Sequence, residues 1–418
     1  MVAASTRSSR SRTVQTEIDI PEAPFRRLLA RASVAAGQPV GIALVVLALY
    51  SAFALTAVLL HGSSSFIGVG SRFAAFSHAS PVISSRLHPH AQLGYDGQFE
   101  YFLALDPRRA HLYMDLPGYR YSHILYPMLA RAVSLGRPDW VPAALILINL
   151  LAVTAGTYFV ARLLVRSGRP APLALLYATF PGMVLAFETD VSEPLAYALV
   201  ALGLLLIGDW HNRRAVTLSA LTFALAALTR ESTLVIPVAV ALVHLAGRER
   251  VALGRAGGFV AIAALPYAAW TAFLHWWLGP IGNSPVFNVG LLPFSGLERT
   301  WPPRDVWPVL SVAIPVGMLC IVCLIRARAE WRNPLFVALA ASLVLLGLYL
   351  PGDTFSNYWS AGRLEIGAVL LALAMVRSLS ATGLTTRLTV VATVMAYLPL
   401  LTLAYSFYHL GGAPIQPR

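Results

Sequence analysis

Long apolar segments alternate with short polar segments along most of the chain. About 20 consecutive apolar residues cross a bilayer as a helix, and eleven segments come close to that measure. They lie near Gly41–His61, Val141–Leu163, Ala171–Phe187, Pro194–Trp210, Ala215–Thr229, Thr233–Ala246, Ala256–Leu278, Val306–Ile325, Pro334–Leu350, Leu364–Leu379 and Leu388–Leu410. The pattern predicts an all-α polytopic membrane protein, a bundle of about eleven transmembrane helices whose main partner is the lipid bilayer.

The polar regions divide the chain into three parts. Residues 1–40, rich in Ser, Thr and Arg, are predicted to be a cytoplasmic tail with a short amphipathic helix. Residues 41–410 form the transmembrane domain, in which residues 62–140 make a first outer loop too long to be a mere connection. Residues 411–418 are expected to be an outer tail.

Charge sets the predicted orientation. Only 12% of the residues are charged against 57% hydrophobic, and all 31 basic residues are arginines. Most arginines fall in the tail and in alternate short loops, which the positive-inside rule places in the cytoplasm. This distribution accounts for the net charge of +12 without nucleic-acid binding. The absence of lysine suggests a GC-rich bacterial genome, and the expected location is the bacterial inner membrane, with the N-terminus cytoplasmic.

The region 215–246 is either one long span or a hairpin broken at Arg230-Glu231-Ser232. A single span would carry the later arginine clusters to the outer side, so the charge rule favours the hairpin. Arg230 and Glu231 then lie in a dip below the outer surface. Ionisable groups at that depth tend to line water-filled sites. A mutual ion pair that plugs the bundle is the competing interpretation.

The first outer loop contains the stretch Tyr95-Asp96-Gly97-Gln98-Phe99-Glu100-Tyr101, then Asp106-Pro107 and Tyr119-Arg120-Tyr121. Gly94 and Gly97 flank Asp96 and permit a tight turn with close backbone approach. The aromatic residues after Asp96 are expected to bed the following helix into the bilayer surface. A carboxylate held there suits a general base, although aspartate beside glycine is also ordinary turn chemistry.

These motifs, in the first outer loop just beyond the first span, resemble the GT-C superfamily of integral membrane glycosyltransferases. The likeness is to bacterial proteins of cell-surface glycopolymer formation and, more distantly, to mannosyltransferases that use polyprenyl- or dolichol-phosphate-mannose. It covers roughly Leu93–Val238, including Thr229-Arg230-Glu231. Beyond that range only the topology is similar.

The resemblance implies an inverting transfer of sugar from a polyprenyl-phosphate-linked donor to a glycan or glycolipid acceptor on the non-cytoplasmic face. It implies that Asp96 is the catalytic base. Outer cations are available to hold the donor phosphate, and each is alternatively a structural ion-pair partner: Arg120, His123, Arg230 and Arg363. The predicted substrate cavity comprises Tyr95, Gln98, Glu100, Asp106, Tyr119, Tyr121, Glu188, Asp190, Glu193, Glu231, Asp353 and Tyr358.

Glu188, Asp190 and Glu193 form a short acidic loop before Pro194. The three acids are consistent with a metal site, with contacts to sugar hydroxyls, or with capping of the next helix. We therefore predict no cofactor but leave a divalent metal open. His88 and His90 lack a nearby third ligand for zinc.

Other functions compete with this prediction. A polymerase or ligase of lipid-linked glycans would typically carry its large loop late in the chain. A transporter usually shows related broken helices in repeated halves, and no such repeat is evident. Neither a P-loop nor a Gly-x-Gly-x-x-Gly turn is present, which disfavours a nucleotide-sugar donor. Cys320 and Cys323 share one apolar run and indicate neither a disulfide nor a zinc site.

Overall fold

The computed structural model describes residues 38–70, 72–73, 94–208, 210, 212–246, 250–279, 314–326, 332–349 and 358–375. Over these residues the protein is helical, and the only β pairing is an isolated bridge between Val69 and Gly94. Residues 1–37 of the predicted N-terminal tail, the predicted outer tail and the last predicted span lie outside the described residues. The all-α prediction is therefore confirmed for the part of the chain that is described.

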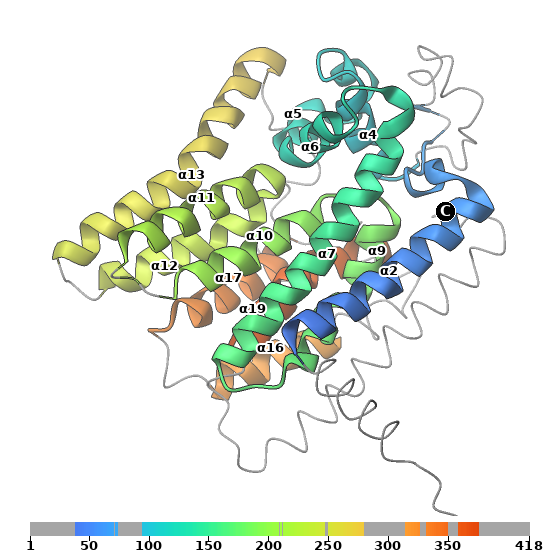
Figure 1. Ribbon diagram of the computed structural model, residues 1–418. Helices are drawn as coiled ribbons and strands as arrows, with labels where there is room; N and C mark the ends of the chain where they lie inside the picture. The colour runs from blue at the N-terminus through green and yellow to red at the C-terminus, as the bar shows by residue number, and fades with distance from the viewer. Residues whose placement is uncertain are drawn as a thin grey trace, which may run out of the picture.

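The long helices pack side by side into a bundle (Figure 1). Helix α2 packs on α7, α7 on α10, α10 on α11, and α11 on α13. Helices α17 and α19 lie against each other, and α19 also contacts α9. The bounds are α2 (Pro39–His61), α7 (Val141–Arg166), α9 (Pro181–Glu188), α10 (Glu193–Leu206), α11 (Arg213–Thr229), α12 (Val235–Ala246), α13 (Arg250–Leu278), α16 (Ile314–Arg326), α17 (Pro334–Tyr349) and α19 (Tyr358–Met375).

Three described helices are long and apolar enough to cross a membrane: Pro39–His61, Pro138–Arg166 and Gly254–Leu278. A bent pair of helices can supply a fourth span. Other predicted spans correspond to shorter apolar helices, at Glu193–Leu206, Glu231–Ala246 and Pro334–Val344. The described residues thus bear out apolar, membrane-compatible helices, and the predicted number of eleven stays a prediction.

The segment of the predicted span Ala171–Phe187 is broken rather than a single straight helix. The chain forms the 3-10 helix η5 (Ala171–Ala174) and helix α8 (Leu175–Ala178), and then bends by 53° before α9. Pro181 is the first residue of α9, and a proline disfavours helical backbone in the residue before it. Phe180 accordingly has ψ 133°. The break therefore has a local cause.

The region 215–246 is a hairpin, as predicted. Helix α11 ends at Thr229, Arg230 is extended, and the 3-10 helix η6 (Glu231–Leu234) leads into α12. The return direction is visible at the other end, where His244 of α12 stacks on Trp210, which precedes α11, with ring centroids 4.0 Å apart. Arg230 therefore lies at the turn between two apolar arms.

The first loop folds into short helices at one end of the bundle: α4 (Gly97–Leu105), α5 (Pro117–Ser122) and α6 (Leu125–Val133). The 3-10 helix η1 (Ser63–Phe66) follows α2, η3 (Ala110–Tyr113) lies between α4 and α5, and η4 (Pro138–Trp140) leads into α7. Phe99, Tyr101 and Phe102 are buried inside the protein, so the expectation that they face the bilayer is wrong. They pack in one cluster with Leu145 of α7, which fastens the loop to the bundle.

Candidate active site

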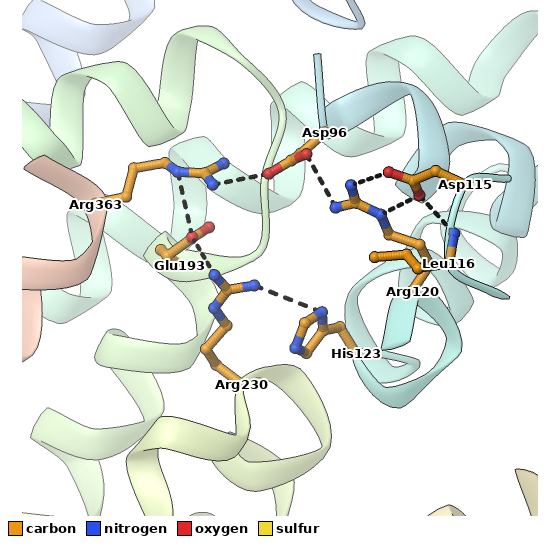
Figure 2. Close-up of polar contacts among 8 residues, drawn as sticks. All are labelled: Asp96, Asp115, Leu116, Arg120, His123, Glu193, Arg230 and Arg363. Atoms are coloured by element: carbon orange, nitrogen blue, oxygen red, sulfur yellow. Dashed lines mark hydrogen bonds and ion pairs between the residues drawn. The ribbon is translucent and has the colours of Figure 1, made fainter. Parts of the chain in front are cut away.

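Asp96 immediately precedes α4, at the position where an aspartate side chain usually caps a helix. Its side chain makes no such cap hydrogen bond. Instead, Arg120 Nη1 donates to Asp96 Oδ1 over 2.9 Å, and Arg363 Nη2 donates to Asp96 Oδ2 over 2.8 Å. Figure 2 shows the carboxylate between the two guanidinium groups. The side chain thus holds two distant arginines rather than the end of its own helix.

A second carboxylate, that of Glu193, lies deeper in the same cluster. Its side chain is 2% exposed, against 34% for Asp96. Glu193 Oε1 is 3.2 Å from Arg230 Nη2 and 3.6 Å from Arg363 Nε. Arg363 therefore bridges the exposed carboxylate and the buried one. Because Glu193 also begins α10, its charge additionally faces the positive end of that helix.

Arg120 has a further partner that the sequence-based analysis missed. Asp115 Oδ1 accepts a hydrogen bond from Arg120 Nε, and Asp115 Oδ2 accepts one from Arg120 Nη2, each over 2.9 Å, so the contact is bidentate. The guanidinium also lies over the Phe99 ring, 4.2 Å from its centroid. In the sequence, only the spacing of five residues between Asp115 and Arg120, with Pro117 between them, could have indicated this pair. Asp115 and Phe99 together fix the position of Arg120.

His123 connects the first loop to the hairpin. Its Nε2 is 2.5 Å from Glu231 Oε2, and its Nδ1 is 3.5 Å from Arg230 Nη1. The Tyr119 ring packs edge-on against the imidazole, with centroids 5.0 Å apart. The first loop, Glu193, Arg230 of the hairpin and Arg363 thus meet in one polar cluster (Figure 2).

Two close backbone contacts bring these segments together. A Cβ on Gly97 would overlap the carbonyl oxygen of Thr189, so only glycine lets α4 start against the acidic loop. A Cβ on Gly182 of α9 would overlap the carbonyl oxygen of Gly362 in α19, the residue before Arg363. The predicted close approach at Gly97 is confirmed. The contact between Gly182 and Gly362 had no counterpart in the sequence-based analysis.

The surroundings shift the pKa values of two acids of the first loop, Asp96 and Glu100, in opposite directions. Burial alone would raise the pKa of Asp96, but Arg120 and Arg363 outweigh it and hold that pKa well below the ordinary value. Burial raises the pKa of Glu100 well above its usual range, which the neighbouring Glu193 reinforces. The arginine contacts therefore favour the ionised form of Asp96, whereas burial favours the neutral form of Glu100.

Asp190 is fully buried in the loop between α9 and α10, and neither carboxyl oxygen has a hydrogen-bond partner within the described residues. Burial raises its pKa well above the ordinary value. Its backbone has φ 49°, a left-handed conformation that aspartate tolerates better than most residues. The predicted acidic loop is thus not a set of three equivalent carboxylates.

Several predicted cavity residues have structural contacts instead. Gln98 is buried and accepts a hydrogen bond from Gly70 N at 3.0 Å. Tyr121 donates to Pro107 O at 2.8 Å and accepts from His111 N at 3.0 Å. Asp106 accepts from the backbone of Arg108 and Arg109 in the turn after α4. Through these hydrogen bonds the three side chains hold the loop in shape.

The remaining predicted residues are placed as follows. The Tyr95 ring lies under Arg363, with the guanidinium carbon 5.1 Å from the ring centroid. Glu188 is the last residue of α9 and is partly buried. Tyr358 begins α19, and Asp353 lies outside the described residues. Within the described part of the chain, no group of three His, Cys, Asp or Glu side chains is arranged to hold a metal ion.

No protein-family profile matches this chain, and no curated protein aligns with it at a significant level. The fold and the site therefore define the class of protein by themselves. It is a helical protein with membrane-compatible spans and a cluster of arginines and carboxylates at one end of its bundle.

Proposed function

We propose that the protein is a membrane glycosyltransferase. It moves a sugar from a polyprenyl-phosphate-linked donor to a glycan or glycolipid acceptor on the non-cytoplasmic face, with inversion. The observation that carries the proposal is the convergence of Asp96 and Arg120 of the first loop with Arg230 of the hairpin and Arg363 of α19. One carboxylate beside several guanidinium groups is what the reaction requires, since a base must take a proton and cations must hold a leaving phosphate.

The roles follow from position. Asp96 is the more exposed of the two carboxylates that Arg363 bridges, at 34% against 2% for Glu193, so an acceptor hydroxyl can reach it. Arg363 and Arg230 lie deeper, at 7% and 12% exposure. Arginine suits a phosphate because its planar fork gives two parallel hydrogen bonds. The apolar helices α2, α7 and α13 provide the surfaces along which a polyprenyl chain can lie within the bilayer.

The test is sugar transfer by the purified protein in nanodiscs, supplied with polyprenyl-phosphate sugars and an extract of envelope glycolipids. Asp96→Asn keeps the size of the side chain but removes its basicity, so transfer should slow by roughly 10² to 10⁴-fold. Asp106→Asn is the matched control, because Asp106 lies in the same loop and contacts only backbone. Near-normal transfer by Asp96→Asn, or a larger loss in Asp106→Asn, would remove Asp96 as the base.

A further inference from the structure

The ion pairs around Asp96 pose a problem for its role as a base. Each carboxylate oxygen already accepts a hydrogen bond from a different guanidinium group, Oδ1 from Arg120 and Oδ2 from Arg363. A carboxylate held in this way has little affinity for a proton. If Asp96 is to accept the proton of an acceptor hydroxyl, the two arginines must be able to give up part of their contact with it.

Every guanidinium group of the cluster already faces a carboxylate. Three guanidinium groups, those of Arg120, Arg230 and Arg363, face three carboxylates. The three carboxylates are those of Asp96, Asp115 and Glu193. An added phosphate therefore finds no uncompensated positive charge unless a carboxylate is neutralised or displaced. Asp96 is the carboxylate best placed to be neutralised or displaced, because Glu193 is only 2% exposed and Asp115 contacts Arg120 with both of its oxygens.

We propose that Arg120 and Arg363 exchange partners during transfer, releasing Asp96 as it is protonated and contacting the departing polyprenyl monophosphate instead. This inference rests on the proposed function, and it identifies the departing polyprenyl monophosphate as the ligand that the arginines bind after Asp96 is protonated. The arginines serve both the base and the leaving group, one after the other.

The charges of the transfer step support this exchange. The acceptor oxygen bonds to the anomeric carbon as the carbon–oxygen bond to the donor phosphate breaks, and that bond's electron pair leaves with the phosphate. The acceptor proton moves to Asp96. The phosphate goes from one negative charge to nearly two, since its second pKa is about 6. Asp96 loses one charge at the same time, so the negative charge moves from the carboxylate to the phosphate while the total stays constant.

The geometry lets both arginines move without losing every partner. Arg120 keeps its two-pronged contact with Asp115, and Arg363 keeps Glu193 beside its Nε. Arg363 Nη1 is buried and donates no hydrogen bond within the described residues, so a phosphate that displaces Asp96 gains a donor that has no other acceptor there. Glu193 is thus a positioning residue that holds Arg230 and Arg363 as a pair for the phosphate.

Asp96→Asn imitates the protonated aspartate and provides the test. The full-length protein in nanodiscs is titrated with farnesyl monophosphate, and the dissociation constant is measured for wild type, Asp96→Asn and Asp106→Asn. We expect Asp96→Asn to bind at least about tenfold more tightly than wild type, since relief of one competing charge is of that order. Asp106→Asn should match wild type. Farnesol, which lacks the phosphate, should not distinguish the three proteins.

Equal or weaker binding by Asp96→Asn, or no binding by either protein, overturns the exchange. The thermal unfolding midpoint checks that the variant is folded, and Asp96→Ser serves in its place if asparagine is not tolerated. Arg363→Ala added to Asp96→Asn should abolish the gain. If wild type transfers sugar but Asp96→Asn gains no affinity, the exchange fails and the proposed function stands. If the affinity gain appears but no donor supports transfer, the phosphate site stands and the glycosyltransferase proposal fails.

Discussion

The contact between Gly182 and Gly362 determines where Arg363 lies, and a single methyl group tests it. Real Cβ atoms essentially never come within 3.0 Å of another heavy atom, yet a Cβ on Gly182 would overlap the carbonyl oxygen of Gly362. Gly182→Ala therefore forces α9 and α19 apart by on the order of 1 Å to restore normal contact. Overpacking of this kind costs about 1–3 kcal/mol of stability.

The shift should also disconnect Arg363 from Asp96. The hydrogen bond between them measures 2.8 Å, and such bonds weaken beyond roughly 3.2 Å. A misplacement of about 1 Å in a reacting group lowers the rate by roughly 10²-fold. We expect Gly182→Ala to lose sugar transfer by about that factor and to unfold at a lower temperature, both measured in nanodiscs.

Alanine substitutions at two other glycines serve as comparisons, because an added Cβ meets less obstruction there than at Gly182. A Cβ on Gly362 would meet Gly182 Cα at 3.2 Å and N at 3.3 Å, so Gly362→Ala needs a shift of only a few tenths of an ångström. Its losses should be clearly smaller. Gly257 of α13 has no atom within 4 Å of an added Cβ, so Gly257→Ala should leave transfer unchanged. Wild-type transfer and stability in Gly182→Ala, or a greater loss in Gly257→Ala, would refute the packing argument.

Two further predictions concern Asp190 and the orientation of the bundle. Burial raises the pKa of Asp190 above the value of about 3.9 that an aspartate has in an unfolded chain. The folded protein therefore keeps its full stability below that value, where Asp190 is protonated in both states, and loses stability as pH rises towards the folded pKa. Asp190→Asn should therefore unfold at a higher temperature than wild type at pH 8, and the difference should shrink towards pH 4; a difference independent of pH would contradict this. For the orientation, we expect an impermeant thiol reagent on intact cells to label Arg108→Cys but not Asn212→Cys, in a background with Cys320 and Cys323 changed to serine. The reverse labelling would invert the proposed topology.

The site shows which of its residues the local sequence pattern could indicate and which it could not. Asp96 was identifiable from its position after the first apolar segment and from the glycines beside it, because tight turns depend on neighbouring residues. Its partner Arg363 lies 267 residues away, and that pairing depends on how α9 and α19 cross. Asp115 carried no comparable signal, since an acid near a proline is common. Local sequence therefore indicated the carboxylate, and packing selected its partners.

The sequence by itself determined that the described chain is helical, that its apolar segments suit a membrane and that the chain turns back at Arg230. These properties follow from composition, periodicity and charge within short windows. Tertiary structure decided that the aromatic residues after Asp96 face the protein rather than the bilayer, that Gln98 and Tyr121 support the loop, and that Glu193 joins Arg230 to Arg363. Such contacts join distant segments, and their energies depend on distance and burial that no short window of sequence contains.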